Sequence, residues 1–343
     1  SSAHAAPSVA RVWGETAIGT ASALSKDAFA SGASTVYVAT VSGFWDALSG
    51  GPAAAKQDGP MLLTEPESLP QETRDELARL RPTTIVIQGG ELAISAGVEE
   101  ALRSYAGNVV RNAGDDEIGT SVLTSQRAFP SGAKSVFVAT SESFYDALSG
   151  GAAAGRNGAP VLLVDPSGVD PRVTAEIARL GASTVYLLGG TLALPEAIET
   201  QLAGAGVTVQ RLWGETALDT ALAINRATIS SARQVYLVTD QAYYDGLSAA
   251  PAADNSSGTV LLTNGQCIAP ATKQYLLSLD PSRVVVVGGT LAMASGMDNL
   301  TECQQDVTIS SATGTWNSPT FTLQPGNYAV SWEAPKECSL SVW

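Results

Sequence analysis

One pattern occurs three times in this chain at intervals of one hundred residues, and it limits the possible folds more than any other feature. The opening Arg11-Val-Trp-Gly-Glu-Thr-Ala returns as Arg211-Leu-Trp-Gly-Glu-Thr-Ala, with Arg111-Asn-Ala-Gly-Asp-Asp-Glu between them. A block of two aromatic residues and an aspartate follows each opening, at residues 44–48, 144–148 and 243–247. Such a repeat indicates three copies of one structural unit, so recurrence alone does not establish three binding sites.

Within each copy, short apolar runs alternate with segments of helical length. The runs are rich in β-branched residues and apolar on both faces, as in Thr84-Ile-Val-Ile-Gln, which is typical of parallel strands covered by helices on both sides. Residues 70–80 place an acidic residue in the first turn and a basic residue near the end, as the helix dipole favours. We therefore expect an α/β fold in which each copy is a three-layer α/β/α sandwich around a parallel sheet.

The pattern changes near residue 306. After it, polar and apolar residues alternate with period two and Pro325-Gly326 is a turn signal, which predicts a small antiparallel β segment. The small residues at the start of the chain are typical of the region around a signal-peptide cleavage site, although tag residues would look the same. We expect an N-terminal tail, three repeats and a C-terminal β appendage, at residues 1–10, 11–110, 111–210, 211–306 and 307–343.

Composition excludes several classes of function. With 45% hydrophobic and 15% charged residues the chain is globular, and its formal charge of −14 opposes binding to nucleic acid. No apolar run reaches the length of a transmembrane helix. The one histidine is His4 and no C-x-x-C pair occurs, so we expect no metal site of the zinc type. No P-loop or G-x-G-x-x-G motif is present, and we expect no cofactor.

Four features together resemble the cell-wall-binding repeat 2 family of Gram-positive surface proteins. They are the opening arginine and glycine, the aromatic-x-Asp-Ala-Leu-Ser block, the Pro-x-Leu-Leu run and the apolar-Gly-Gly turn. The resemblance covers residues 11–306. The resemblance implies toprim-like units around a pseudo-threefold axis, which attach a secreted protein non-covalently to a cell-wall polymer. The family opening usually continues Gly-x-Asp-Arg-Tyr, and no copy here has that basic residue, which argues against a strongly anionic polymer.

Three cysteines, Cys267, Cys303 and Cys338, lie in the last quarter of the chain, as expected for one disulfide in an oxidising compartment. Cys267 follows a Leu-Leu strand of the third repeat and Cys303 follows its last helix, so we expect these two to pair. On a chain-entropy basis this disulfide would stabilise the fold by roughly 3–4 kcal/mol. Cys338 would then be free or paired outside the chain.

Nine residues are candidate ligand contacts. The aspartates either meet a ligand at the carboxyl ends of parallel strands or occupy the first turn of the next helix. The second aromatic of each block either stacks on a sugar or is exposed without function, whereas the first is expected in the core. The arginines either line a groove between repeats or bridge adjacent repeats. The three sets are Trp45, Tyr145 and Tyr244; Asp46, Asp146 and Asp245; and Arg11, Arg111 and Arg211.

The function expected from these observations is non-catalytic anchoring of a secreted protein to a cell-wall glycopolymer or peptidoglycan-associated polymer, on the surface of a Gram-positive bacterium. Three weak sites would act together. The alternative is a surface adhesin or self-assembling scaffold that does not bind the wall polymer. A secreted hydrolase is disfavoured because three similar aspartates match triplicated binding better than one asymmetric active site.

Overall fold

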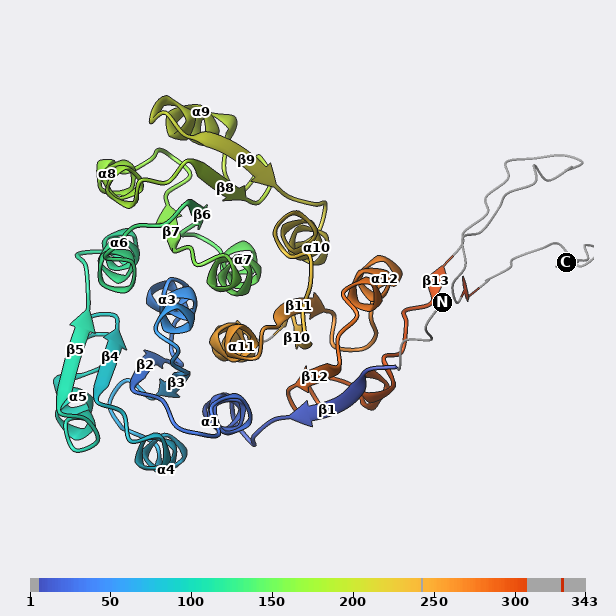
Figure 1. The fold of residues 1–343 in the computed structure, drawn as a ribbon, viewed down its shortest axis with the longest axis horizontal. Coiled ribbons are helices and arrows are strands. Elements are labelled where there is room, and N and C mark those ends of the chain that lie inside the picture. Colours follow the sequence, from blue (N-terminus) through green and yellow to red (C-terminus); the bar gives the residue numbers. More distant parts are fainter. Residues whose placement is uncertain (1–5, 242, 307–327, 330–343) are drawn as a thin grey trace, which may run out of the picture.

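The structure, a computed structural model, describes residues 6–241, 243–306 and 328–329. Three parallel four-stranded sheets, each flanked by helices, are arranged in a ring (Figure 1). This confirms the expected fold of three repeated parallel α/β units. We call the units 1, 2 and 3 in chain order.

The four strands of each sheet follow the same spatial order in all three units. In unit 1 they are β3 (Met61–Thr64), β2 (Thr35–Thr40), β4 (Thr84–Gln88) and β5 (Asn108–Asn112). In unit 2 they are β7 (Val161–Val164), β6 (Ser135–Thr140), β8 (Thr184–Leu188) and β9 (Thr208–Leu212). In unit 3 they are β11 (Thr259–Thr263), β10 (Gln234–Thr239), β12 (Arg283–Val287) and β1 (Ser8–Val12).

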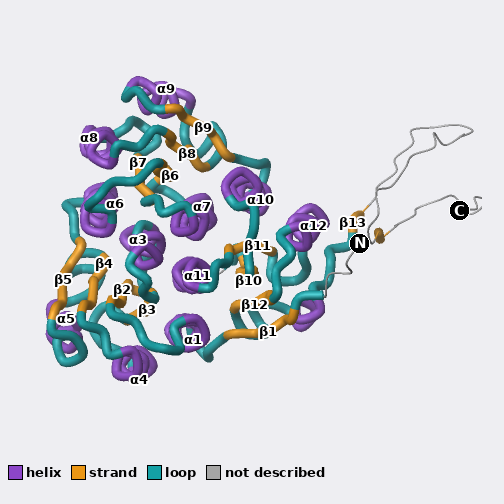
Figure 2. Tube along the Cα trace, viewed as in Figure 1, coloured by secondary structure: helices purple, strands orange, loops and turns teal. Residues whose placement is uncertain are grey.

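The helices that connect these strands also follow the same order in each unit (Figure 2). Unit 1 has α1 (Ala17–Ala28), α2 (Trp45–Leu48), α3 (Gly50–Lys56), α4 (Gln71–Leu80) and α5 (Ala96–Leu102). Unit 2 has α6 (Glu117–Ala128), α7 (Tyr145–Arg156), α8 (Pro171–Leu180) and α9 (Glu196–Gly204). Unit 3 has α10 (Ala217–Thr228), α11 (Tyr243–Asn255), α12 (Pro270–Ser278) and a 3₁₀ helix at Ser295–Asn299.

The first strand of the chain closes the ring. β1 pairs in parallel with β12, with Ser8 opposite Arg283 and Val12 opposite Val287, so the sheet of unit 3 is completed from the other end of the sequence. In units 1 and 2 the corresponding edge strands, β5 and β9, follow directly along the chain. Each opening arginine therefore belongs to the sheet that precedes its repeat in the ring.

The inner helices α3, α7 and α11 pack against one another at the centre of the ring (Figures 1 and 2). Small residues allow this close approach, because a Cβ atom on Gly155 would lie 3.0 Å from the Cβ of Ala55 and one on Gly51 would lie 3.4 Å from that of Ala250. One hydrophobic core cluster runs from Ile18 in unit 1 through unit 2 to Val287 in unit 3, and units 1 and 3 each have a further cluster of their own. The three units are thus joined by the shared cluster.

The C-terminal quarter contains the expected disulfide. Cys267 and Cys303 are bonded, with their Cα atoms 4.9 Å apart, which confirms the prediction. Beyond it, β13 (Gln305–Asp306) pairs with β14 (Tyr328–Ala329) in parallel, whereas we expected antiparallel strands. The rest of the expected β segment, with its turn signal at Pro325-Gly326, and Cys338 lie outside the described residues. None of the helices in the described part of the chain has the length and apolar character of a membrane span.

Candidate functional site

The three aromatic-aspartate blocks follow the carboxyl ends of β2, β6 and β10. In units 2 and 3 the block begins the inner helix, and in unit 1 it forms α2, which directly precedes the inner helix α3. The rings of Phe44 and Phe144 are half-buried and meet with their centroids 5.2 Å apart, so the blocks of units 1 and 2 converge. Trp45 stacks on Phe44 and is 46% exposed, and Tyr145 packs on Phe144 and is 39% exposed. Tyr244, in unit 3, is half-buried. The side chain of Tyr243 lies outside the described residues.

Each aspartate of these blocks lies in the first turn of its helix, and its carboxylate packs against the first glycine of a Gly-Gly turn. A Cβ atom on Gly89 would lie 2.5 Å from Oδ2 of Asp46, and one on Gly189 would lie 2.4 Å from Oδ2 of Asp146. Gly89 and Gly189 also have φ of 103° and 101°, which glycine tolerates and other residues rarely adopt. The glycine therefore makes both the turn and the space for the carboxylate.

Burial raises the pKa of all three carboxyl groups, because a charged group loses its hydration. The pKa of Asp245, the most deeply buried, rises to about 6. For Asp46, a hydrogen bond with Thr120 opposes the effect of burial on the pKa, and the nearby charge of Glu117 adds to it.

The opening motif of the following unit packs beside each aspartate, which creates three equivalent junctions around the ring. The first junction brings Asp46 to Thr120, between units 1 and 2. The second contains a pocket of about 380 Å³ lined by Asp146 and Trp213, among others, and the third a pocket of about 400 Å³ lined by Asp245 and Trp13. Both pockets lie at the carboxyl ends of parallel strands, where open α/β sheets bind ligands.

Tryptophan in the opening motif is a site residue that our sequence reasoning missed. Trp13 and Trp213 are 46% and 54% exposed, and each ring lies on the second glycine of a Gly-Gly turn. A Cβ atom on Gly289 would come 3.0 Å from the Trp13 ring, and one on Gly190 would come 3.4 Å from the Trp213 ring. The shared tryptophan of the first and third openings was the signal available in the sequence.

The three opening arginines make the same contacts in the three sheets. Arg11, Arg111 and Arg211 donate to the carbonyl oxygens of Gly288, Gly89 and Gly189 at 2.8, 2.8 and 3.0 Å. Each also forms an ion pair, with Asp298, Glu99 and Glu199 respectively. Their side chains are only 13%, 15% and 10% exposed, so these guanidinium groups hold the edge strand to the Gly-Gly turn.

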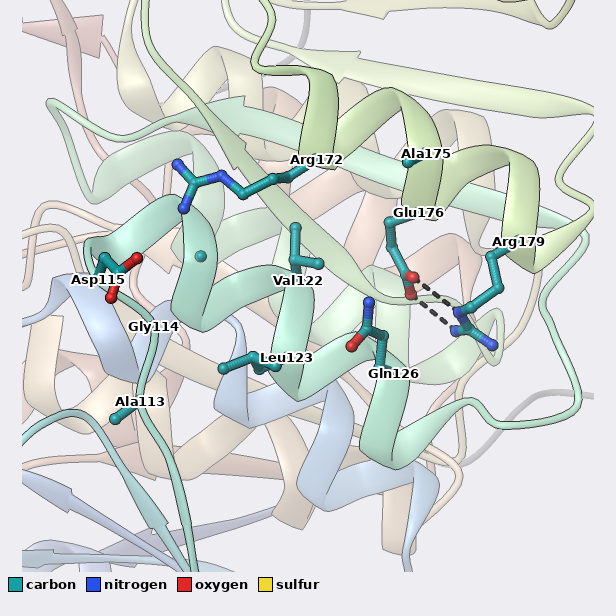
Figure 3. A pocket seen from close by; sticks show the side chains of 11 residues that line it. Ala113, Gly114, Asp115, Val122, Leu123, Gln126, Arg172, Ala175, Glu176 and Arg179 are labelled. Carbon is teal, nitrogen blue, oxygen red and sulfur yellow. Dashed lines mark hydrogen bonds and ion pairs between the residues drawn. The ribbon is translucent and has the colours of Figure 1, made fainter.

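A further pocket, of about 560 Å³, lies over α6 and α8 beside the first junction (Figure 3). Arg179 donates to the buried carboxylate of Glu176 within it. Arg172 pairs with Asp116 and Asp170, and these contacts lower the pKa of both carboxyl groups. Both arginines and the glutamate that line this pocket are thus paired within the protein, and the carboxylate of Asp115 also lines it. Among the described residues, no group of three or more His, Cys, Asp or Glu side chains is placed to hold a metal ion.

A comparison with protein families identifies the repeat. The family described as cell wall binding domain 2 (CWB2) matches residues 11–99, 111–199 and 211–297. The chain belongs to the cell wall binding domain 2 family. Cell wall binding is therefore the general property that the three units share with the family.

Individual relatives resemble this CWB2 chain at low identity. The N-acetylmuramoyl-L-alanine amidase LytC of Bacillus subtilis (strain 168) is 26% identical over 85% of this chain. Cwp6 and Cwp8 from Clostridium difficile share the fold, with TM-scores of 0.80 and 0.78 at 22% and 23% identity, over 87% and 86% of this chain. The chain spans 58% of LytC, 48% of Cwp6 and 51% of Cwp8.

Proposed function

We propose that this chain is a non-catalytic module that holds a secreted protein on a bacterial cell wall without a covalent bond. The observation that carries the proposal is the repeated junction, in which an aspartate of one unit, packed on a Gly-Gly turn, meets the opening motif of the next. The ligand is a glycopolymer of a Gram-positive wall, and the junctions bind it together. Several weak sites on one rigid ring give a total affinity that exceeds each alone.

The candidate residues divide between two roles in this proposal. The second aromatics and the aspartates, which border the junctions, contact the ligand. The arginines keep the edge strands in place, because their hydrogen bonds are directed to backbone carbonyl groups and carboxylates of the protein. Membership in a binding family and similarity to LytC over part of its length both support a targeting role for the module.

Co-sedimentation with purified Gram-positive walls tests the proposal. The chain should pellet with walls before or after removal of the wall teichoic acids, and the unbound fraction should fall as wall is added. A chain that stays in the supernatant with both preparations contradicts wall anchoring. The Leu277→Ala variant is the control, because Leu277 is 51% exposed and lines neither of the pockets at the second and third junctions.

One observation favours the alternative of an adhesin or self-assembling scaffold. Leu92, Leu192 and Leu291 follow the three Gly-Gly turns and are fully exposed, so the same apolar side chain faces solvent at three equivalent positions, two of them beside the junction pockets. Gel filtration over a wide range of protein concentration distinguishes the two functions. Oligomers that dissociate in a Leu92→Asp, Leu192→Asp, Leu291→Asp variant, without affinity for walls, would support the scaffold. A monomer that binds walls would exclude it.

A further inference from the structure

The three junctions differ in one residue of the opening motif. The second and third junctions have Trp213 and Trp13, whereas the first has Ala113 at this position. At the first junction a Cβ atom on Gly90 would meet nothing within 4 Å, so no ring covers the turn there. The second and third junctions therefore each offer a flat, partly exposed aromatic surface in a pocket, at a position where the first has none.

The second feature of these pockets is a buried carboxylate. A threonine of the opening motif lies at each junction: Thr120 beside Asp46, Thr220 in the pocket of Asp146 and Thr20 in the pocket of Asp245. Burial raises the pKa of Asp146 and Asp245 because their carboxylates lose hydration. Asp245 is only 7% exposed and lines the pocket of the third junction. A buried carboxylate gains from every hydrogen bond that it accepts, so a ligand hydroxyl that donates to it would be favourable.

Charge limits the chemistry of the ligand. Asp146 and Glu215 line the pocket of the second junction, and Asp245 and Glu15 line that of the third. Among the described residues that line these two pockets there is no Lys, Arg or His. Thr191 and Thr290 add neutral hydroxyl groups at equivalent positions. A phosphate or uronate would face like charge in either pocket, without a guanidinium to pair with it.

We propose that the second and third junctions each bind an uncharged pyranose ring of the wall glycan, a hexose or an N-acetylhexosamine, with its face on Trp213 or Trp13 and a hydroxyl group donating to Asp146 or Asp245. A pyranose ring has an apolar face of C–H groups and O–H donors at its edge, which match an aromatic surface beside an acceptor. This inference rests on the proposed function, because the ring belongs to the same wall polymer.

The test measures affinity for purified walls from which the teichoic acids have been removed, by co-sedimentation of the whole chain. Trp13→Ala and Trp213→Ala should each weaken binding about tenfold, and the double variant should weaken it further. The double Trp→Phe variant retains a ring at both positions and should recover most of the affinity. Thermal unfolding of every variant shows whether the fold is intact, and Leu277→Ala is the control.

Salt dependence tests the charge of the ligand. Binding of uncharged rings should change less than about twofold between about 0.05 and 0.5 M NaCl, because no ion pair is screened. A tenfold change would overturn the choice of an uncharged sugar. A folded double Trp→Ala variant that binds like the parent chain would overturn the inference while wall anchoring stands. A parent chain that binds native walls but not stripped walls would also overturn the inference, whereas a parent chain that binds neither preparation would remove the proposed function.

Discussion

Units 2 and 3 satisfy the same backbone groups with different chemistry. In unit 2, Arg179 on α8 donates to the carbonyl oxygen of Phe129 at the end of α6, and also to Glu176, whose side chain is fully buried. In unit 3, Tyr275 on α12 donates to the equivalent carbonyl of Ile229 at 2.7 Å. A neutral phenol thus replaces an ion pair between a buried carboxylate and a partly exposed guanidinium, so the fold requires a donor at this place and not a charge.

The two units also differ in how their sheets are completed. The edge strand of unit 2, β9, follows α9 along the chain, whereas the edge strand of unit 3, β1, comes from the N-terminus. Unit 3 has the Cys267–Cys303 disulfide in addition. The last unit of the ring is therefore held by long-range contacts where unit 2 relies on chain continuity.

The largest expected effect comes from removing the strand that closes unit 3. Deletion of residues 1–12 leaves β12 as an unpaired edge and removes every hydrogen bond of Arg11. We expect the free energy of unfolding, measured by urea denaturation, to fall by about 4 kcal/mol or more. Deletion of residues 1–6, which precede β1, is the control. Equal stability of both deletions would show that unit 3 does not need its N-terminal strand.

The ion pair of unit 2 should give the next largest effect. Arg179→Ala leaves the buried carboxylate of Glu176 with only the hydroxyl of Ser125 as partner. Removing one partner of a buried pair strands a charge, so we expect a loss of about 3 kcal/mol in urea denaturation at pH 7. Arg179→Lys is the matched control and should lose less. A loss below about 1 kcal/mol for Arg179→Ala would mean that the pair is no more important than the phenol of unit 3.

The aspartates of units 2 and 3 should differ in their response to pH. The pKa of Asp245 is about 6 in the folded chain, above its usual value of 3.8. The folded state therefore holds this proton more tightly, and stability falls as pH rises from about 4 through 6. Asp245→Asn should be more stable than the parent by about 2 kcal/mol at pH 7.5 and equal to it at about pH 3.5.

Asp146→Asn is the control for this prediction. Asp146 is half-buried, whereas Asp245 is buried, and burial raises the pKa of both carboxyl groups. Its gain in stability should be smaller than that of Asp245→Asn. An Asp245→Asn variant whose stability follows the parent at every pH would show that Asp245 does not titrate abnormally.

The smallest effect belongs to the neutral contact of unit 3. Tyr275→Phe removes the hydroxyl group that donates to the carbonyl oxygens of Asn225 and Ile229. We expect a loss of about 1 kcal/mol, measured by urea denaturation, because neutral hydrogen bonds contribute little net stability. A loss equal to that of Arg179→Ala would remove the energetic difference between the two units.

Local patterns in the sequence predicted much of the fold. The β-branched apolar runs, the helix signals and the repeat predicted three parallel α/β units, and the positions of Cys267 and Cys303 predicted the disulfide. The pairing of β1 with β12 was not predicted, because it joins segments at opposite ends of the chain. No local pattern specifies such a partner, and the repeat itself suggested that each copy was complete.

The candidate site was predicted only in part. The aspartates and second aromatics were recognised because they recur, and they lie at the junctions. Trp13 and Trp213 were missed because their role depends on the Gly-Gly turns on which their rings lie, and the turn that meets Trp13 is near the other end of the chain. For the arginines the sequence allowed two roles, lining a groove between repeats or bridging adjacent repeats. Their hydrogen bonds from the edge strand to the Gly-Gly turn favour a structural role.

Hydrogen–deuterium exchange of the chain, with and without muramidase-solubilised wall fragments, tests most directly whether the junctions bind the wall. We predict slower exchange in the segments that form the second and third junctions, at residues 13–17, 190–193, 213–217 and 289–292. The outer helices α5 and α9 should exchange as in the free chain. Protection confined to those outer helices, with unchanged exchange at the junctions, would contradict the account.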